Sequence, residues 1–323
     1  MTGPIRTIVA GIATLDTEDP VLKPALTLAE ELGATLHVMH VFDLPEPIQA
    51  AYEERMIFDP TLLKRYGRDL EIRLENRVRA LASGANVICH VRRGAVSACL
   101  GELSVTIGAD LLIVGAARRG RTWRHQLGSA AEGVIRASGV PVLVLRQPLA
   151  RDVTRVLLTS DLSDRSEGVL ARGFALVAAL FASSEPEYRS LVVVHYDPES
   201  AVPLRPEVLT EVATTELNRL LERSLRGEHS VVGKVRIGEP ADEVLCEASE
   251  WQADLLVVGA HGRPGNHDFL LGSVAGSTLR GASCNVLVVP SIPPIRADSD
   301  VSGRMSRVRH GKRLATEPML SHL

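Results

Sequence analysis

The chain contains one sequence pattern twice. Residues 110–145 (DLLIVGAARRGRTWRHQLGSAAEGVIRASGVPVLVL) align without a gap on residues 254–289 (DLLVVGAHGRPGNHDFLLGSVAGSTLRGASCNVLVV). The starts of the copies also correspond, with IRTIVAGIATLD at 5–16 over VTRVLLTSDLSD at 153–164. Chance would not keep apolar segments and glycines in register over such a length, so the pattern indicates a duplicated structural unit. The chain is therefore expected to fold as two copies of one domain.

Each copy alternates short apolar segments with longer amphipathic ones. In the first copy, strands are expected at 7–12, 35–41 and 141–145 and in segments ending at Gly94 and Gly115, and helices at 20–32, 61–83, 95–107 and from Gly128. In the second copy, strands are expected at 156–160, 191–196 and 285–289 and in segments ending at Gly238 and Gly259, and helices at 166–180, 207–226, 240–251 and from Gly272. This alternation predicts parallel βαβ units with helices on both faces of an open sheet.

The composition suits such a sheet. Hydrophobic residues make up 45% of the chain and aromatic residues 3%, so the cores must consist mainly of Val, Leu, Ile and Ala. One proline and two charges at 147–152 mark a boundary. We expect a first domain at 1–150 and a second at 151–292. Residues 293–323 are basic and poor in apolar residues, which predicts a flexible polar tail, with a docking arm as the alternative.

Several function classes are disfavoured by composition. The net charge of −3 lacks the basic surplus typical of nucleic-acid binding. No apolar run reaches the roughly 20 residues that span a bilayer, and the first residues lack the features of a signal peptide. The four cysteines are scattered without a Cys-x-x-Cys pair, which predicts reduced thiols and no zinc site. We expect a cytoplasmic protein with no metal site of its own.

One loop of the second copy has the chemistry of a phosphate site. Gly259 ends an apolar strand, Gly262 follows in the loop, and Gly272-Ser273 opens the next helix. Parallel sheets bind ligands at the carboxyl ends of their strands, and a helix amino end offers unpaired N–H groups to an anion. Ser273 can add a hydroxyl donor and Arg263 a charge. The alternative is purely structural: a tight glycine turn followed by an ordinary helix cap.

The same spacing resembles a known family. Gly-x2-Gly-x9-Gly-(Ser/Thr), after a strand that opens with Asp-Leu, is similar to the ATP-binding signature of the universal stress protein family. Asp161 stands where that family has an acidic residue that contacts the nucleoside, and Tyr196 stands where a small apolar residue lines the adenine. The nucleotide-binding residues that the resemblance implies are Thr159, Asp161, Tyr196, Val258, Gly259, Gly262, Arg263, Gly272, Ser273 and Val274.

The resemblance covers about residues 5–146 and 153–290 and also implies an architecture. Each half should be a Rossmann-like domain of the adenine nucleotide alpha hydrolase-like type, with a five-stranded parallel sheet flanked by helices. The two halves should pack as an intramolecular pseudo-dimer, because the apolar fifth strands PVLVL and NVLVV need covering. Two chains are expected to associate further as a homodimer.

The first copy departs from the signature. Arg118 occupies the position of Gly262, and Ala13 falls where Asp161 falls in the second copy. A side chain at position 118 crowds a backbone bend meant for phosphate, and the carboxylate that would accept a ribose hydroxyl is missing. We expect the first copy to bind nucleotide weakly or not at all and to act as a scaffold. The alternative is a different anion held by the arginines at positions 118, 119, 121 and 124.

The function expected from the sequence is a non-catalytic regulator of the stress response that binds ATP, with or without Mg²⁺. The signatures of Walker-type NTPases, dinucleotide oxidoreductases and α/β-hydrolases are absent from the sequence. A slow ATPase is the alternative, with His261, His267 and Asp268 as candidate groups. Another adenine nucleotide, such as a cyclic one, is a third reading of the same site.

Overall fold

The structure is a computed structural model that describes residues 4–16, 19–43, 60–82, 84–116, 129–196, 205–225, 230–260 and 271–291. The first half contains strands β1 Thr7–Ile12, β2 Thr35–Phe42, β3 Asn86–Arg93, β4 Leu111–Gly115 and β5 Val142–Leu145, with helices α1 Leu22–Leu32, α3 Pro60–Leu81, α4 Val96–Thr106 and α5 Ser129–Ser138. The second half contains strands β6 Arg155–Ser160, β7 Glu187–Val194, β8 Val231–Ile237, β9 Leu255–Gly259 and β10 Asn285–Val289, with helices α6 Ser166–Leu180, α7 Pro206–Leu225, α8 Pro240–Glu250 and α9 Ser273–Gly281.

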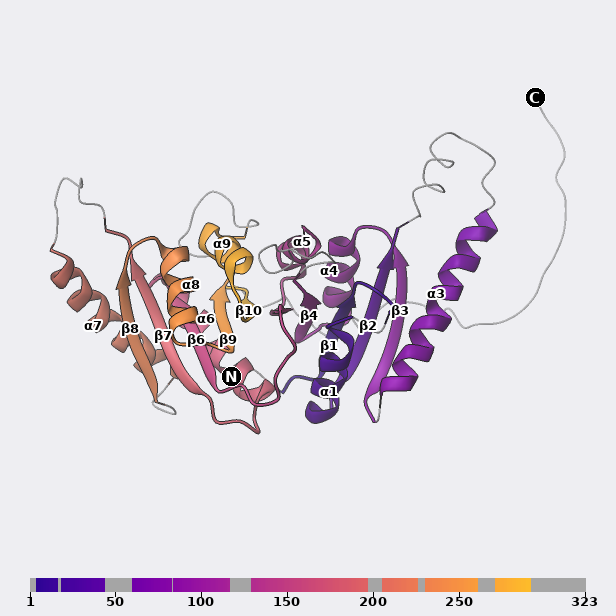
Figure 1. The fold of residues 1–323 in the computed structure, drawn as a ribbon, viewed down its shortest axis with the longest axis horizontal. Helices are drawn as coiled ribbons and strands as arrows, with labels where there is room; N and C mark the ends of the chain where they lie inside the picture. Colours follow the sequence, from indigo (N-terminus) through magenta and orange to yellow (C-terminus); the bar gives the residue numbers. More distant parts are fainter. Residues whose placement is uncertain are drawn as a thin grey trace, which may run out of the picture.

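The strands form one ten-stranded sheet in the order β3-β2-β1-β4-β5-β10-β9-β6-β7-β8. All pairs within a half are parallel, so the predicted fold class, two tandem five-stranded parallel sheets with flanking helices, is confirmed. The halves meet where β5 pairs antiparallel with β10, through Leu143 opposite Leu287 and the residues beside them. Figure 1 shows the halves side by side, with α3 and α7 at opposite ends. The pairing leaves neither β5 nor β10 as an open edge.

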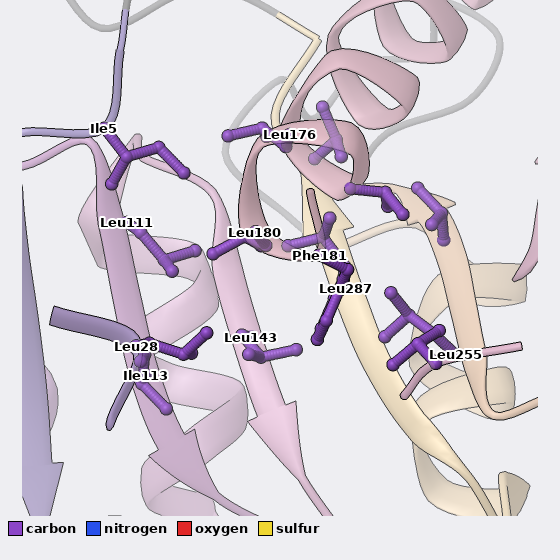
Figure 2. Packing of buried hydrophobic residues seen from close by; sticks show 14 of the residues in the cluster. Ile5, Leu28, Leu111, Ile113, Leu143, Leu176, Leu180, Phe181, Leu255 and Leu287 are labelled. Atoms are coloured by element: carbon purple, nitrogen blue, oxygen red, sulfur yellow. The ribbon is translucent and has the colours of Figure 1, made fainter. Parts of the chain in front are cut away.

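Helices cover both faces of this sheet. The buried side chains of α1, α3, α6 and α7 form one apolar cluster with the sheet, and those of α4, α5, α8 and α9 form the other. The first cluster crosses the junction of the halves. Figure 2 shows Leu143 and Leu287 under Leu180 and Phe181, which lie at the end of α6. Because burial of apolar surface is the main stabilising term, this shared core holds the halves in a fixed relation.

The second strand of the second half differs from the sequence-based expectation. The apolar run predicted a strand over 191–196, whereas β7 spans Glu187–Val194. The earlier residues alternate in burial, with Tyr188 and Ser190 buried, and they pair in register with β6. Successive side chains of a strand point to opposite faces, and Arg189, between these two residues, pairs with Glu247 on the other face, so a continuous apolar run is not required there. Tyr196 consequently lies beyond the end of the strand.

A polar cluster holds α8 onto the outer strands of the second half. The Glu247 side chain is fully buried and pairs with Lys234 Nζ at 2.8 Å, with Arg236 Nε at 2.7 Å, and with Arg189. The Arg189 guanidinium also lies over the Trp251 ring, 4.3 Å from its centroid. Burial opposes the charge of Glu247, but hydrogen bonds from Lys234, Arg189 and Arg236 outweigh it and hold the pKa of Glu247 below its usual value.

Two histidines occupy the corresponding place in the first half. His37 Nδ1 lies 3.0 Å from His90 Nε2, and the two rings are stacked with centroids 5.2 Å apart. Burial lowers the pKa of both, and for His90 the charges of His37 and Arg92 lower it further. The stacked pair is therefore suited to neutral imidazoles.

These lowered pKa values predict an acid-sensitive first half. The unfolded histidines bind protons near their ordinary pKa of 6.5, whereas the folded pair binds them only at lower pH. Stability from the pair is thus present above that value and is lost as the pH falls below it. Urea unfolding of the wild type should show a lower midpoint at about pH 5.5 than at about pH 7.5. The double variant His37→Leu/His90→Leu should lose much of that difference, and an unchanged pH dependence would contradict the prediction. His195→Leu, at an exposed histidine, is the control.

Candidate functional site

The candidate site lies at the switch point of the second half, where β6 separates β9 from β7. From β6 the chain continues to one side through β7 and β8, and it returns to the other side through β9 and β10. Ligands bind to open parallel sheets at such a switch point, beyond the carboxyl ends of the strands that flank it, here β6 and β9. The pairing of these strands ends at Leu158 opposite Val257. The Thr159 hydroxyl, one residue on, donates to the Val257 carbonyl at 3.2 Å.

Asp161 follows β6 directly, and one of its oxygens is bonded within its own loop. Its Oδ1 accepts hydrogen bonds from the Ser163 N–H at 3.0 Å and from the Ser166 hydroxyl at 2.6 Å. Burial raises the pKa of Asp161, but the hydrogen bonds from Ser166 and Ser163 more than offset it and place the pKa below the usual value. Within the described residues, no hydrogen bond reaches Oδ2. Asp161 is thus an anion at neutral pH, and Oδ1 is the oxygen that its own loop binds.

The loop between β9 and α9 is fastened at both ends. Ala260, just after Gly259, donates its N–H to the Val289 carbonyl of β10 at 2.8 Å. Gly272 in turn donates its N–H to the Ala260 carbonyl at 2.9 Å. The two ends of the signature are thereby brought together beside β10, although twelve positions of the sequence pattern separate Gly259 from Gly272. Gly262 and Arg263, like His261, His267 and Asp268, lie outside the described residues.

The amino end of α9 is the second element of the candidate site. Gly272 precedes the helix with extended φ and ψ angles of −57° and 148°, and no side chain of the described residues caps the helix there. Ser273 and Val274 are exposed in the first turn. The first N–H groups of a helix have no intrahelical acceptor, and the helix dipole makes this end positive. Phosphate oxygens are suitable partners for these groups.

A polar pair borders the site on its outer side, and the sequence reading missed it. His195 Nδ1 lies 3.0 Å from Glu239 Oε1, and both side chains are exposed. They follow β7 and β8, so the parallel sheet brings them together at the same edge as Asp161. Tyr196 is half-buried next to His195. The signal was present in the sequence, because His195 directly follows the apolar end of β7 in VVVHYD and Glu239 follows β8 after one glycine in VRIGE.

The first half differs in the side chains packed against its first strand. A carbon placed on Gly11, the counterpart of Thr159, would come within 2.6 Å of Leu100 Cδ1. Val244, the smaller counterpart of Leu100, stands in the second half. In the first half, the apolar side chain of Leu100 therefore fills the space in which the second half carries the Thr159 hydroxyl.

A buried carboxylate also occupies the loop after β1. Asp19 is 7% exposed, and its Oδ2 accepts from the N–H groups of Ala13 at 3.0 Å and Thr14 at 3.4 Å. Its Oδ1 accepts from the N–H groups of Val21 at 2.9 Å and Leu22 at 3.1 Å. The first half thus keeps an acid in this loop but turns it inward onto the backbone. Asp19 fixes the start of α1 and has no oxygen left without a donor.

The described residues contain no group of three or more His, Cys, Asp or Glu side chains arranged to hold a metal ion. Across the same parts of the chain, every helix is too short or too polar for a membrane span. Arg118 and its neighbouring arginines lie outside the described residues, so the alternative of a second anion site stays a prediction.

Comparison with known proteins places these features in a family. The model of the universal stress protein family matches residues 4–146 and again 153–290. Universal stress protein G of Escherichia coli O157:H7 is 30% identical over 148 residues, which are 44% of this chain and 99% of that protein. Universal stress protein A homolog 2 of Coxiella burnetii is 34% identical over 84 residues, which are 26% of this chain and span 55% of that relative's length.

A solved structure shares the whole fold. The crystal structure of a universal stress protein from Archaeoglobus fulgidus DSM 4304 aligns with a TM-score of 0.56 and 17% identity, covering 88% of this chain and 98% of that one. At this identity the likeness concerns the fold alone. The family model, in contrast, matches nearly all of the chain outside its last residues, once in each half. The chain therefore belongs to the universal stress protein family and is a tandem member with two such domains.

Proposed function

We propose that the second half binds ATP or a related adenine nucleotide and that the first half does not. The observation that carries the proposal is that two groups suited to a nucleotide follow neighbouring strands: an ionised Asp161 after β6, and, after β9, the amino end of α9, which no described side chain caps. The carboxylate is suited to a ribose hydroxyl and the helix amides to phosphate oxygens. The family signature at Gly259, Gly262, Gly272 and Ser273 adds support from the sequence.

The remaining predicted residues have separate parts in this proposal. In this proposal the nucleoside lies near Thr159 and Val258, and Tyr196 supplies an apolar ring edge for the base. Val274 and Arg263, which lies outside the described residues, are assigned to the phosphates from the sequence pattern, and Mg²⁺ can accompany the phosphates without protein ligands of its own. In the first half, the Leu100 side chain packs against Gly11, the counterpart of Thr159. The Asp19 carboxylate there accepts hydrogen bonds from the backbone N–H groups of its own loop.

The protein then acts as a non-catalytic regulator in the stress response, whose nucleotide occupancy is read by a partner. In this proposal the halves form an intramolecular dimer through β5 and β10, and two chains associate through other surfaces. The first half contributes support to the second rather than a second nucleotide.

Nucleotide released from freshly purified protein tests the proposal. The protein is denatured, the soluble fraction is analysed by mass, and emptied protein is then dialysed against labelled ATP. We expect an adenine nucleotide in the released fraction or saturable uptake of ATP at one molecule per chain. Protein that releases no adenine nucleotide and takes up none would refute the proposed function.

A further inference from the structure

A side chain of the first half binds the carboxyl end of α9, the helix whose amino end belongs to the candidate phosphate site. Arg146 directly follows β5, and its guanidinium donates hydrogen bonds to the carbonyls of Leu279 and Arg280, the second of these at 3.2 Å. Both carbonyls belong to the last turn of α9. Carbonyls at a helix carboxyl end lack intrahelical donors, and a cation there also complements the helix dipole. Arg146 thus caps α9 from the other half of the chain.

The backbone of the same segment is held as well. Asn285, the first residue of β10, accepts through Oδ1 from the N–H of Arg146 at 2.8 Å and from the N–H of Gln147 at 3.1 Å. The Asn285 side chain is buried, and the strand it opens pairs with β5. The arginine is therefore fixed relative to the connection between α9 and β10, which limits the freedom of its side chain.

The second half has no equivalent of this contact. In the repeat, Pro290 is the counterpart of Arg146, and Pro141 is the counterpart of Asn285. Proline has neither the guanidinium donors nor the amide acceptor that the contact needs. The second half cannot hold α5 in the way that the first half holds α9. The candidate sites differ between the halves in the same way, since α9, the helix of the half with the intact signature, is the one whose carboxyl end is capped by the other half.

α9 is short enough for its two ends to be coupled. It has nine residues, and its amino end is tied to β9 by the bond from Gly272 N–H to the Ala260 carbonyl. A helix of this length moves as a unit, so a displacement of its carboxyl end also changes the direction of its first N–H groups. We propose that Arg146 is a positioning residue for nucleotide binding in the second half. By holding the carboxyl end of α9, it lets the first half set the direction of the N–H groups at the amino end of that helix. The inference rests on the proposed function.

Nucleotide titration of matched variants tests this role. Arg146→Ala removes the cap, Arg146→Lys keeps a cation that can reach one carbonyl, and Arg136→Ala removes an exposed arginine of α5 that pairs with Glu132 inside the first half. ATP affinity is measured by calorimetry below the unfolding temperature of every variant. We expect Arg146→Ala to weaken binding between roughly twofold and thirtyfold, Arg146→Lys to weaken it less, and Arg136→Ala to match the wild type.

Amide hydrogen exchange of the nucleotide-free proteins provides a second measurement. Arg146→Ala should speed exchange in α9 and leave α8 unchanged, whereas general destabilisation would speed both. Wild-type affinity in Arg146→Ala would overturn the positioning role and leave the proposed function standing. Equal weakening by Arg136→Ala would also overturn it. A wild-type protein that binds no adenine nucleotide would instead refute the proposed function, and this inference with it.

Discussion

Glu247→Ala is expected to lower the free energy of unfolding by about 3 kcal/mol. This is the largest effect on stability that we predict for the substitution of a charged residue by alanine. The carboxylate is fully buried and is shared by Arg189, Lys234 and Arg236. Its removal leaves three cations without their common partner beneath α8. These cations keep some contact with water. The expected loss of stability is therefore at the lower end of the range found when one partner of a buried ion pair is removed.

Urea unfolding at neutral pH measures this effect. Glu102→Ala is the matched control, because Glu102 is also a helix glutamate that pairs with an arginine, Arg92, but both side chains are exposed. The control should cost less than about 1 kcal/mol. The difference between the wild type and Glu247→Ala should shrink as the pH falls. The lowered pKa of Glu247 means that its contribution is present above the ordinary pKa of 4.5 and is lost as the pH falls through the folded value. Equal unfolding midpoints for the two variants would contradict the role given to Glu247.

Asp161→Asn is expected to weaken ATP binding by roughly tenfold to a hundredfold, with little change in stability. Asparagine keeps one oxygen, which can accept the bonds from Ser163 and Ser166 and so preserve the loop. The amide nitrogen then replaces Oδ2, and it cannot accept a ribose hydroxyl. The charge-assisted hydrogen bond to the ligand is lost while the fold is retained.

Calorimetric titration with ATP measures this loss. Asp164→Ala removes an exposed carboxylate of the same loop and should bind as the wild type does. Gly262→Arg, which copies Arg118 of the first half, should abolish binding by crowding the loop. Full affinity in Asp161→Asn would reject the carboxylate as a ligand contact, and full affinity in Gly262→Arg would reject the explanation offered for the degenerate first half.

The repeated elements could be predicted from the sequence because local and global signals agree in them. β1, β10 and α6 have the predicted bounds, since continuous apolar runs of strand length and a long amphipathic segment leave little choice. The sequence predicts a start for β7 that is too late, because the first half of the strand alternates polar and apolar residues. The fold class followed from the alternation of elements, which does not depend on such errors at single boundaries.

The parts of the candidate site that could not be predicted are those that depend on contacts between distant residues. Asp19 lies several residues after Ala13, so a position-by-position comparison with Asp161 records only a missing acid. The exchange of Thr159 for Gly11 becomes meaningful only when Leu100 is seen to fill the space. Arg146 has no role in the sequence pattern until β5 and β10 are seen to pair. Tertiary placement, not propensity, decides each of these.

A crystal structure of the full chain grown in excess ATP would distinguish the two halves directly. We expect nucleotide density beside Asp161, with the phosphates at the amino end of α9, and none at the equivalent end of α5. Nucleotide in the first half, with or without a molecule in the second, would refute the proposed asymmetry between the halves.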